Sequence, residues 1–342
     1  MIYITVRAKK RGLKEAFINN LFVSLIYSLT LTIHVIIITF VLPVKREFIV
    51  FPFNLLMICF LVLFFPIFYL LIVREKRNIK KGKAKIEELK SRAQEILPLK
   101  YDIYRKLTHL VVLAIILFYF TLGYLIQNFF TYLLQFFPKF VSDVFYSIFT
   151  VEGDFMIFTQ YLVMFLVGIS LIGLLTADFV RILKPKFYPL KSVNEILRKK
   201  ELHMRLGPQI SMAVGCFSII ILYGLFQPLG PLIICTSMTI AIFGDIASNL
   251  IGRTIGKRKI RNTNKTYEGL IAGVVVAFSS GIIILILLRN FYIISVLGFF
   301  VLPLMGAIII GVLDFLTLEI DDTLSYPIVT STVLFLISIL II

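Results

Sequence analysis

One segment of the chain, from Gly244 to Gly269, combines residue types that suit the binding of a phosphate chain. Glycines let the backbone approach a phosphate and point N–H groups at it, while Lys and Arg side chains neutralise its oxygens. A helix expected to begin after the cations adds the positive end of its dipole. The residues of this segment predicted to bind a nucleotide, with the acids holding its metal ion, are Gly244, Asp245, Gly252, Arg253, Gly256, Lys257, Lys265, Thr266, Glu268 and Gly269.

A solvated basic turn is the simpler interpretation of this segment. It would account for the lysines, but it would need neither the spaced glycines nor the flanking acids Asp245 and Glu268. The segment is also not a Walker A loop, because the glycines are spaced too closely and Arg258 follows Lys257 where Ser or Thr should stand.

Acidic residues on both sides of the cations suggest a metal ion. Magnesium is usually held by one or two carboxylates together with substrate phosphates. We predict Asp245, Glu268 and Asp321 as its ligands, and Asp322 as a group that accepts a proton. A solvated acidic loop that balances the basic segments is the alternative for the second set of acids, which are Asp314, Glu319, Asp321 and Asp322.

Two further clusters of charged residues stand at the ends of apolar runs. Arg105 and His109 are four residues apart and share a helix face, and Asp178 and Arg181 are three apart and can pair. Ionisable groups at membrane depth are costly, which makes them functional candidates. We predict that Arg105 and Arg181 contact phosphate and that His109 and Asp178 take part in catalysis. A membrane-surface anchor and a structural ion pair are the respective alternatives.

The elements that position these residues are predicted to be membrane helices. The chain has 342 residues, of which 59% are hydrophobic, and its mean hydropathy is +0.97. Soluble domains are about 45–50% apolar, so the long uncharged runs predict an all-α polytopic membrane protein with about nine transmembrane helices. The predicted spans lie at about 16–43, 49–73, 107–127, 155–177, 208–226, 232–251, 267–288, 293–313 and 324–342. The aromatic segment 128–153 is interpreted as interfacial or re-entrant.

The distribution of charge predicts the orientation of these spans. With the N-terminus in the cytoplasm, the inner segments 1–15, 74–106, 178–206 and 252–266 hold 31 of the 35 Lys and Arg residues. Such an excess is typical of cytoplasmic loops. The glycine-rich segment and the acidic loop then both face the cytoplasm. Nothing in the sequence indicates a nucleic-acid partner, and the oligomeric state is left open.

The sequence can be divided near residue 99 into an N-terminal extension and a region that contains the candidate site residues. Residues 1–99 hold two predicted spans and a basic linker with apolar residues at helical spacing over 86–96, which predicts a surface amphipathic helix or a solvated charged linker. Residues 100–342 contain all the candidate site residues. The three cysteines lie in apolar runs without paired spacing, so no disulfide or metal role is expected.

The residues of the glycine-rich segment resemble the shared motif of the CTP-dependent lipid kinases, which include dolichol kinase, phytol kinase and a diacylglycerol kinase. The matching positions are Gly244, Asp245, Ala247, Asn249, Gly252, Arg253, Gly256, Lys257, Lys265, Thr266, Glu268 and Gly269. Arg105, Lys106 and His109 resemble the entry of the first core helix of that group, and the segment from Ile320 to Pro327 resembles its closing segment, with Thr323 where Asn is common. The resemblance covers residues 100–342.

The resemblance implies an enzyme that transfers the γ-phosphate of CTP, with Mg²⁺, to an isoprenoid alcohol such as dolichol or polyprenol in the bilayer. The product would be a lipid monophosphate that serves glycan assembly. Phytol, diacylglycerol and a CDP-lipid synthase reaction are the alternatives. Phosphatidate cytidylyltransferases have a similar glycine-rich segment but a different closing signature, which is missing from this sequence. A transporter or scaffold that binds anionic lipid is a third class. The composition suits a prokaryotic, archaeal-type plasma membrane.

Overall fold

Helices make up nearly all of this protein, as seen in a computed structural model. The structure describes residues 1–42, 48–80, 98–149, 155–190, 193–194, 197–202, 204–261, 263, 265–316 and 318–341. Among them the sole strand-type pairing is an isolated antiparallel bridge between Lys259 and Thr266. The predicted all-α fold is confirmed.

Eight helical segments of the described chain are long and apolar enough to cross a membrane. The helices of the first half are α1 (Ile2–Lys10), α2 (Lys14–Ile36) with its π-turn η1 (Ile37–Val41), α3 (Phe53–Lys80), α5 (Leu99–Leu110), η2 (Val111–Leu113), α6 (Ala114–Leu117), η3 (Phe118–Leu122), α7 (Gly123–Leu134) and α8 (Lys139–Phe149). Those of the second half are α9 (Phe155–Leu183), η4 (Pro185–Phe187), α10 (Lys199–Leu202), α11 (Pro208–Tyr223), α12 (Leu229–Thr254), α13 (Tyr267–Leu288), α14 (Val296–Leu316) and α15 (Asp322–Ile341). The multi-pass prediction is confirmed, and the predicted fifth span is the shorter α11, an apolar helix of 16 residues.

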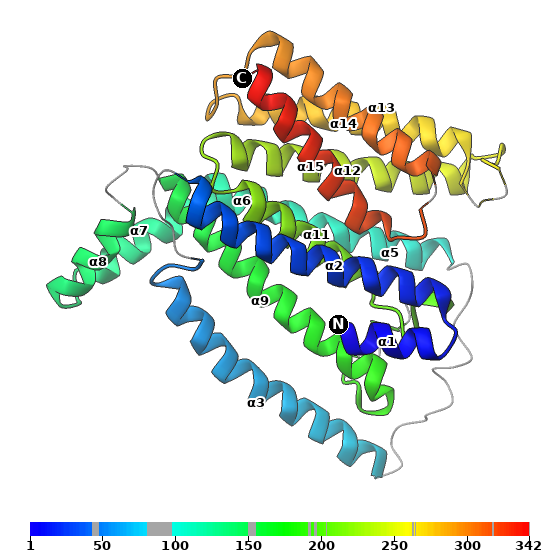
Figure 1. Ribbon diagram of the computed structural model, residues 1–342, viewed down its shortest axis with the longest axis horizontal. Helices are drawn as coiled ribbons and strands as arrows, with labels where there is room; N and C mark the ends of the chain where they lie inside the picture. The colour runs from blue at the N-terminus through cyan, green and yellow to red at the C-terminus, as the bar shows by residue number, and fades with distance from the viewer. Residues whose placement is uncertain are drawn as a thin grey trace.

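Some predicted boundaries differ from the observed ones. The predicted third span, 107–127, is part of one helical run from Leu99 to Leu134, which starts in a polar stretch that contains Asp102 and Arg105 and continues past the predicted end through apolar residues. The aromatic segment after it contains the end of α7 and all of α8, which project together from one end of the bundle (Figure 1). The amphipathic helix predicted over 86–96 lies outside the described residues.

The second half of the chain forms the centre of the bundle. Helices α12 to α15 lie side by side, and α11 packs between α15 on one side and α9 and α2 on the other (Figure 1). Helix α12 is the most enclosed element, with 78% of its apolar window buried inside the protein. Small residues explain the close contact between α12 and α13, since an added Cβ at Gly273 would lie 3.2 Å from the carbonyl oxygen of Gly244. Helix α12 is therefore the rigid element on which the site is built.

Helix α2 belongs to the same bundle even though it precedes residue 99. Its buried face is mostly polar: besides Ala16 and Val23, the buried residues are Asn19, Asn20, Ser24, Thr30 and His34. This face meets α11: Thr30 Oγ1 donates to Ser218 Oγ at 3.0 Å, and His34 Nδ1 lies 2.5 Å from the carbonyl oxygen of Ile221. Polar groups inside a membrane need such partners, so these contacts join α2 to the bundle.

Basic turns and helix ends gather at one end of the bundle, which we call the basic end. The α1–α2 turn, the start of α5 and the described residues of 184–207, of 255–266 and of the α14–α15 connection all lie there (Figure 1). Ion pairs link them, for example between Arg253 and Asp102 and between Lys265 and Asp322. The predicted site residues lie at this end because every helix that bears one begins or ends there.

Candidate active site

A cavity of about 600 Å³ opens at the basic end of the bundle. Helices α2, α5, α11, α12 and α15 contribute to its wall, together with the α12–α13 turn. Its charged lining consists of the cations Arg105, Lys106, Arg198, Arg205, Arg253, Lys259 and Lys265 and the acids Glu15, Glu201, Asp245, Glu319, Asp321 and Asp322. The cavity therefore offers groups for an anion and groups for a cation within one volume.

Eleven of the seventeen predicted site residues line this cavity. They are Arg105, His109, Asp245, Asn249, Gly252, Arg253, Gly256, Lys265, Thr266, Asp321 and Asp322. These residues come from four separate parts of the sequence, and the structure brings them together. The predicted residues Asp178, Arg181, Gly244, Lys257, Glu268 and Gly269 do not contribute to the lining.

Asp245 is the acid of α12 that faces α5. Its carboxylate pairs with Lys106 and lies 3.7 Å from His109 Nδ1. Lys106 and His109 are three residues apart, so both point from one face of α5 toward the same carboxylate. A buried carboxylate that bonds to an imidazole can orient the ring and stabilise its protonated form.

Asp102 organises the arginines of the cavity, and the sequence analysis did not select it. Its side chain is fully buried, and its carboxylate lies 2.7 Å from Arg253, 3.2 Å from Arg105 and 3.5 Å from Arg198. Glu201 is a second partner of Arg105, at 3.2 Å. Its place three residues before Arg105 could have indicated that ion pair from the sequence. Its other partners, Arg198 and Arg253, are distant in the chain and could not have been found in this way.

The guanidinium groups around Asp102 also act on one another. Burial lowers the pKa of Arg198, and the like charge of Arg105 lowers it further, against the opposing carboxylates of Glu201 and Asp102. Crowded guanidinium groups gain from a bound anion, because Arg presents a planar fork that matches carboxylate and phosphate oxygens. This corner of the cavity is therefore suited to a phosphate.

Lys265 forms the opposite wall. Its ammonium lies 2.8 Å from Asp314 Oδ1 and 3.1 Å from Asp322 Oδ2. Burial lowers the pKa of Lys265, but the carboxylates of Asp322 and Asp314 outweigh burial, so the pKa lies above its ordinary value. The lysine is positively charged at neutral pH.

Asp314 is a structural member of that wall. Its carboxylate accepts hydrogen bonds from Ser248 at 2.6 Å and from the Tyr326 hydroxyl at 2.9 Å, in addition to Lys265. With these partners Asp314 ties together α12, α14 and α15. Asp322 pairs with Lys265 and lines the cavity, whereas Asp314 does not contribute to the lining, so Asp322 is the more available acid of the two.

The glycines of the α12–α13 turn have a steric role in this structure. A Cβ at Gly269 would lie 2.6 Å from the carbonyl oxygen of Ser248, and one at Gly256 would overlap the carbonyl oxygen of Gly252 and the side chain of Thr266. Thr266 caps α13 by accepting a hydrogen bond from the backbone N–H of Gly269 at 3.2 Å. The glycines thus let α12 and α13 converge under the turn, and phosphate contact by Gly252 and Gly256 stays a prediction.

Glu268 and Lys257 lie on the outer side of the same turn. The Glu268 carboxylate accepts backbone hydrogen bonds from Lys257 at 3.2 Å and from Arg258 at 3.2–3.3 Å. The Lys257 side chain is exposed. In this geometry Glu268 stabilises the turn and does not face the cavity.

The three residues predicted as magnesium ligands do not converge. Asp245 pairs with Lys106, Asp321 pairs with Arg205, and Glu268 caps the turn. Among the described residues, no three His, Cys, Asp or Glu side chains lie close enough to hold a metal ion by themselves. The residues that fit magnesium together with phosphate oxygens are Asp245 and Asp322, since both line the cavity and one or two carboxylates are the usual protein share.

Asn249 provides a further sign that the cavity accommodates a polar ligand. It lies one helical turn after Asp245 on α12 and lines the cavity. Within the described chain its buried Oδ1 atom has no hydrogen-bond partner. Buried polar atoms are almost always paired, so this oxygen is available to a ligand or to water.

Residues 204–207, which we call the strap, hold Arg205 against the cavity. Arg205 pairs with Asp321 and is 3.7 Å from Glu15. Asp321 also accepts from Ser211 Oγ at 2.7 Å, and its backbone N–H donates to Asn19 at 3.2 Å. The sequence analysis selected Asp321 but missed Arg205, Ser211 and Asn19.

Asp178 and Arg181 lie behind the strap. They pair at 2.6 Å with almost no exposed surface. Arg181 donates to the carbonyl oxygens of Glu201 and Arg205, both at 2.8 Å, and Asp178 accepts from the backbone N–H of Gly207 at 3.1 Å. Their hydrogen bonds are directed to backbone groups, which is the arrangement of a structural ion pair that positions the strap.

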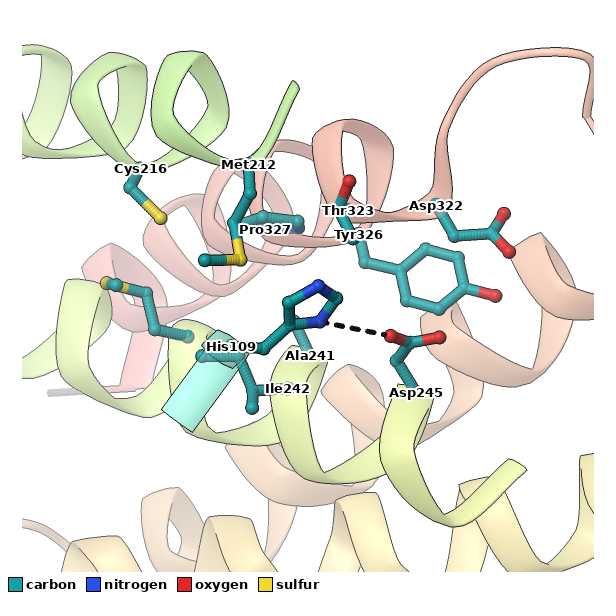
Figure 2. A pocket seen from close by; sticks show the side chains of 11 residues that line it. His109, Met212, Cys216, Ala241, Ile242, Asp245, Asp322, Thr323, Tyr326 and Pro327 are labelled. Carbon is teal, nitrogen blue, oxygen red and sulfur yellow. Dashed lines mark ion pairs between the residues drawn. The ribbon is translucent and has the colours of Figure 1, made fainter. Parts of the chain in front are cut away.

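A small apolar pocket adjoins the cavity and extends between α11, α12 and α15. It is lined by His109, Met212, Cys216, Met238, Ala241, Ile242, Asp245, Asp322, Thr323, Tyr326 and Pro327. Figure 2 shows the His109 ring beside Asp245, with Met212 and Cys216 approaching from α11 and Asp322 and Tyr326 from α15. His109, Asp245, Asp322 and Thr323 line both volumes, so they form the junction between a charged cavity and the apolar interior.

Comparisons with family models, with curated proteins and with solved structures find no match to this chain.

Proposed function

We propose that this protein is an integral membrane kinase that transfers the γ-phosphate of CTP to the hydroxyl of a long-chain isoprenoid alcohol such as dolichol or polyprenol. The observation that supports this most is the shared wall of the two volumes. The charged cavity suits a nucleotide phosphate chain, and the adjoining apolar pocket suits the first carbons of a lipid alcohol. A hydroxyl held at His109 and Asp322 would meet a phosphate held by the surrounding cations.

The cations of the cavity have defined tasks under this proposal. Arg105, Arg198 and Arg253 bind oxygens of the phosphate chain as planar forks, and Lys265 neutralises the transferred group as a point charge. Magnesium, held by Asp245 and Asp322 when bound, would neutralise charge that develops on the phosphates. The ion pairs present in the structure exchange partners when ligand enters.

The reaction itself requires one proton transfer. The alcohol oxygen forms a bond to the γ-phosphorus, the bond from that phosphorus to the bridging oxygen breaks, and CDP leaves with the electron pair. The hydroxyl proton passes to His109, the titratable group at the junction that is not assigned to magnesium. The His109 ring lies 3.7 Å from the Asp245 carboxylate, which can orient it for this transfer.

The charge distribution supports a cytoplasmic location for the cavity. The cations that line the cavity belong to three of the predicted inner segments, 74–106, 178–206 and 252–266, and an excess of Lys and Arg is typical of cytoplasmic segments. CTP is a highly charged cytoplasmic metabolite, so the phosphate donor and the cavity would lie on the same side of the membrane. The proposed location is a prokaryotic, archaeal-type plasma membrane.

The test uses purified full-length protein in lipid nanodiscs with Mg²⁺ and a panel of prenols, phytol, diacylglycerol and phosphatidate. We expect label in the lipid product from [γ-³²P]CTP and none from [α-³²P]CTP. Label from the α-position alone would show a CDP-lipid synthase instead. No label with any acceptor would reject both reactions and favour a transporter or scaffold. Exposed Lys186 in η4 lies outside the cavity, so K186A serves as the control variant.

A further inference from the structure

The N-terminal helix α2 reaches the cavity, although the motifs of the candidate site all lie after residue 99. Glu15 lines the cavity wall and Asn19 accepts from the backbone N–H of Asp321. Asn20, on the next position of the same helix, is fully buried. Three neighbouring residues of α2 therefore contact the part of the site that contains Arg205 and Asp321.

Asn20 binds the strap on both sides of Arg205. Its side-chain amide donates to the carbonyl oxygen of Met204 at 2.8 Å and accepts from the backbone N–H of Leu206 at 2.8 Å. These two bonds use the donor and the acceptor of one amide on the residues that flank Arg205. An amide side chain bonded in this way replaces the strand neighbour that an extended backbone would otherwise need.

The backbone of the strap requires such support. Met204 has a φ of 57°, in the left-handed region that non-glycine residues rarely adopt. Conformations of this kind persist where surrounding contacts fix them, and they concentrate at functional sites. Four side-chain bonds fix the strap: two come from Asn20, and one each from Arg181 and Asp178.

These four bonds determine the position of Arg205. Its side chain is only 3% exposed, yet it lines the cavity and pairs with Asp321. A buried guanidinium at a cavity wall is preorganised for an anion, because its fork is already oriented and partly desolvated. The orientation depends on where the strap places the Arg205 backbone.

We propose that Asn20 is a positioning residue that sets Arg205 for the phosphate chain of the ligand, so that α2 is a working part of the site. This inference rests on the proposed function in taking a polyphosphate as the ligand, but it concerns binding and not transfer. It assigns a role to residues 1–42, which the family resemblance does not cover.

The test is a double-mutant cycle on ligand binding. Full-length N20A, R205A and the double variant are measured with Mg-CTP and with inorganic tripolyphosphate, and only the folded fraction from size-exclusion chromatography is used. We expect R205A to weaken binding roughly tenfold or more and N20A roughly threefold to tenfold. The double variant should bind as R205A does, because Asn20 acts through Arg205.

Additive losses in the double variant, or unchanged affinity in N20A, would overturn the inference. If N20A does not fold, N20S takes its place in the cycle, since serine can make one of the two bonds. Thr32 on α2 is exposed and bonds only to the Ser28 carbonyl oxygen in its own helix, so T32A is the matched control and should bind normally.

Outcomes for transfer and binding separate the two proposals. If wild-type protein binds tripolyphosphate but transfers no label, the kinase proposal fails and the cycle still decides the role of Asn20. If wild-type protein transfers label and N20A binds normally, only the role of Asn20 fails. If wild-type protein binds neither Mg-CTP nor tripolyphosphate, both proposals are overturned.

Discussion

Among the segments that bring cations to the cavity, the α12–α13 turn and the strap are built in opposite ways. The α12–α13 turn is fixed by close backbone approach, with Gly256 and Gly269 at positions that leave no room for a Cβ. The strap is fixed by side chains from other helices, which bond to its backbone around Arg205. The turn is local in sequence, whereas the strap depends on residues up to 186 positions away.

This difference explains how each segment responds to change. A turn made by glycines is sensitive to added volume, and its charged side chains can be exchanged with little effect on the backbone. A strap made by side-chain bonds is sensitive to loss of those side chains. The three predictions below test this contrast.

Loss of Arg181 should have the largest effect on stability. R181M leaves the fully buried Asp178 carboxylate without its cation and frees two backbone carbonyls of the strap region. Breaking a buried pair in this way costs about 3–5 kcal/mol. Thermal unfolding in detergent micelles measures the loss. K184M, at an exposed site three residues on, should fall within about 0.5 kcal/mol of wild type, and an equally stable R181M would show that the strap needs no such support.

Among the residues of the α12–α13 turn, Lys265 should matter most for catalysis, and its loss should leave the backbone of the turn in place. K265M removes the cation between Asp314 and Asp322, and the glycine contacts beneath the turn remain. Removal of one group that stabilises transition-state charge typically lowers kcat roughly 100- to 1,000-fold. The γ-label transfer assay in nanodiscs measures kcat against the K186A control. A K265M protein that is well folded and fully active would exclude Lys265 from the site.

Added volume at Gly269 should have the smallest of the three effects. G269A places a Cβ 2.6 Å from the carbonyl oxygen of Ser248, so α12 and α13 must separate slightly. Overpacking of this kind costs about 1–3 kcal/mol. The matched control is G173A in α9, where the nearest atoms belong to Phe64 at 3.9 Å and the change should be neutral or mildly stabilising. Equal unfolding temperatures for the two variants would contradict the steric role of Gly269.

Much of the fold could be predicted from the sequence, because long apolar runs report membrane spans directly. Part of the candidate site could also be predicted, because its residues form recognisable local patterns. Asp245, Arg253 and Lys265 lie in one compact motif, and His109 and Asp322 lie at span ends where charge is unexpected. The structure places all five on the cavity wall.

The rest depends on contacts that no local pattern reports. Asn19 and Asn20 lie in an ordinary polar start of a helix, and nothing in their spacing indicates Asp321 or the strap. Asp102 could be paired with Arg105 from spacing, but not with Arg253, which follows 151 residues later. Glu268 was assigned to metal by its place beside the cations, whereas its carboxylate turns outward to cap backbone groups.

The polar face of α2 also has a consequence for synthesis. Asn20 pairs with Met204 and Leu206, and Thr30 pairs with Ser218, so the partners of this early helix are made 184 to 188 residues later. At about 5–20 residues per second, the ribosome needs on the order of 10 to 40 s to supply them. During that interval α2 stays at the translocon or in the lipid with unmatched amides, and its final docking is a late step in the biogenesis of the protein.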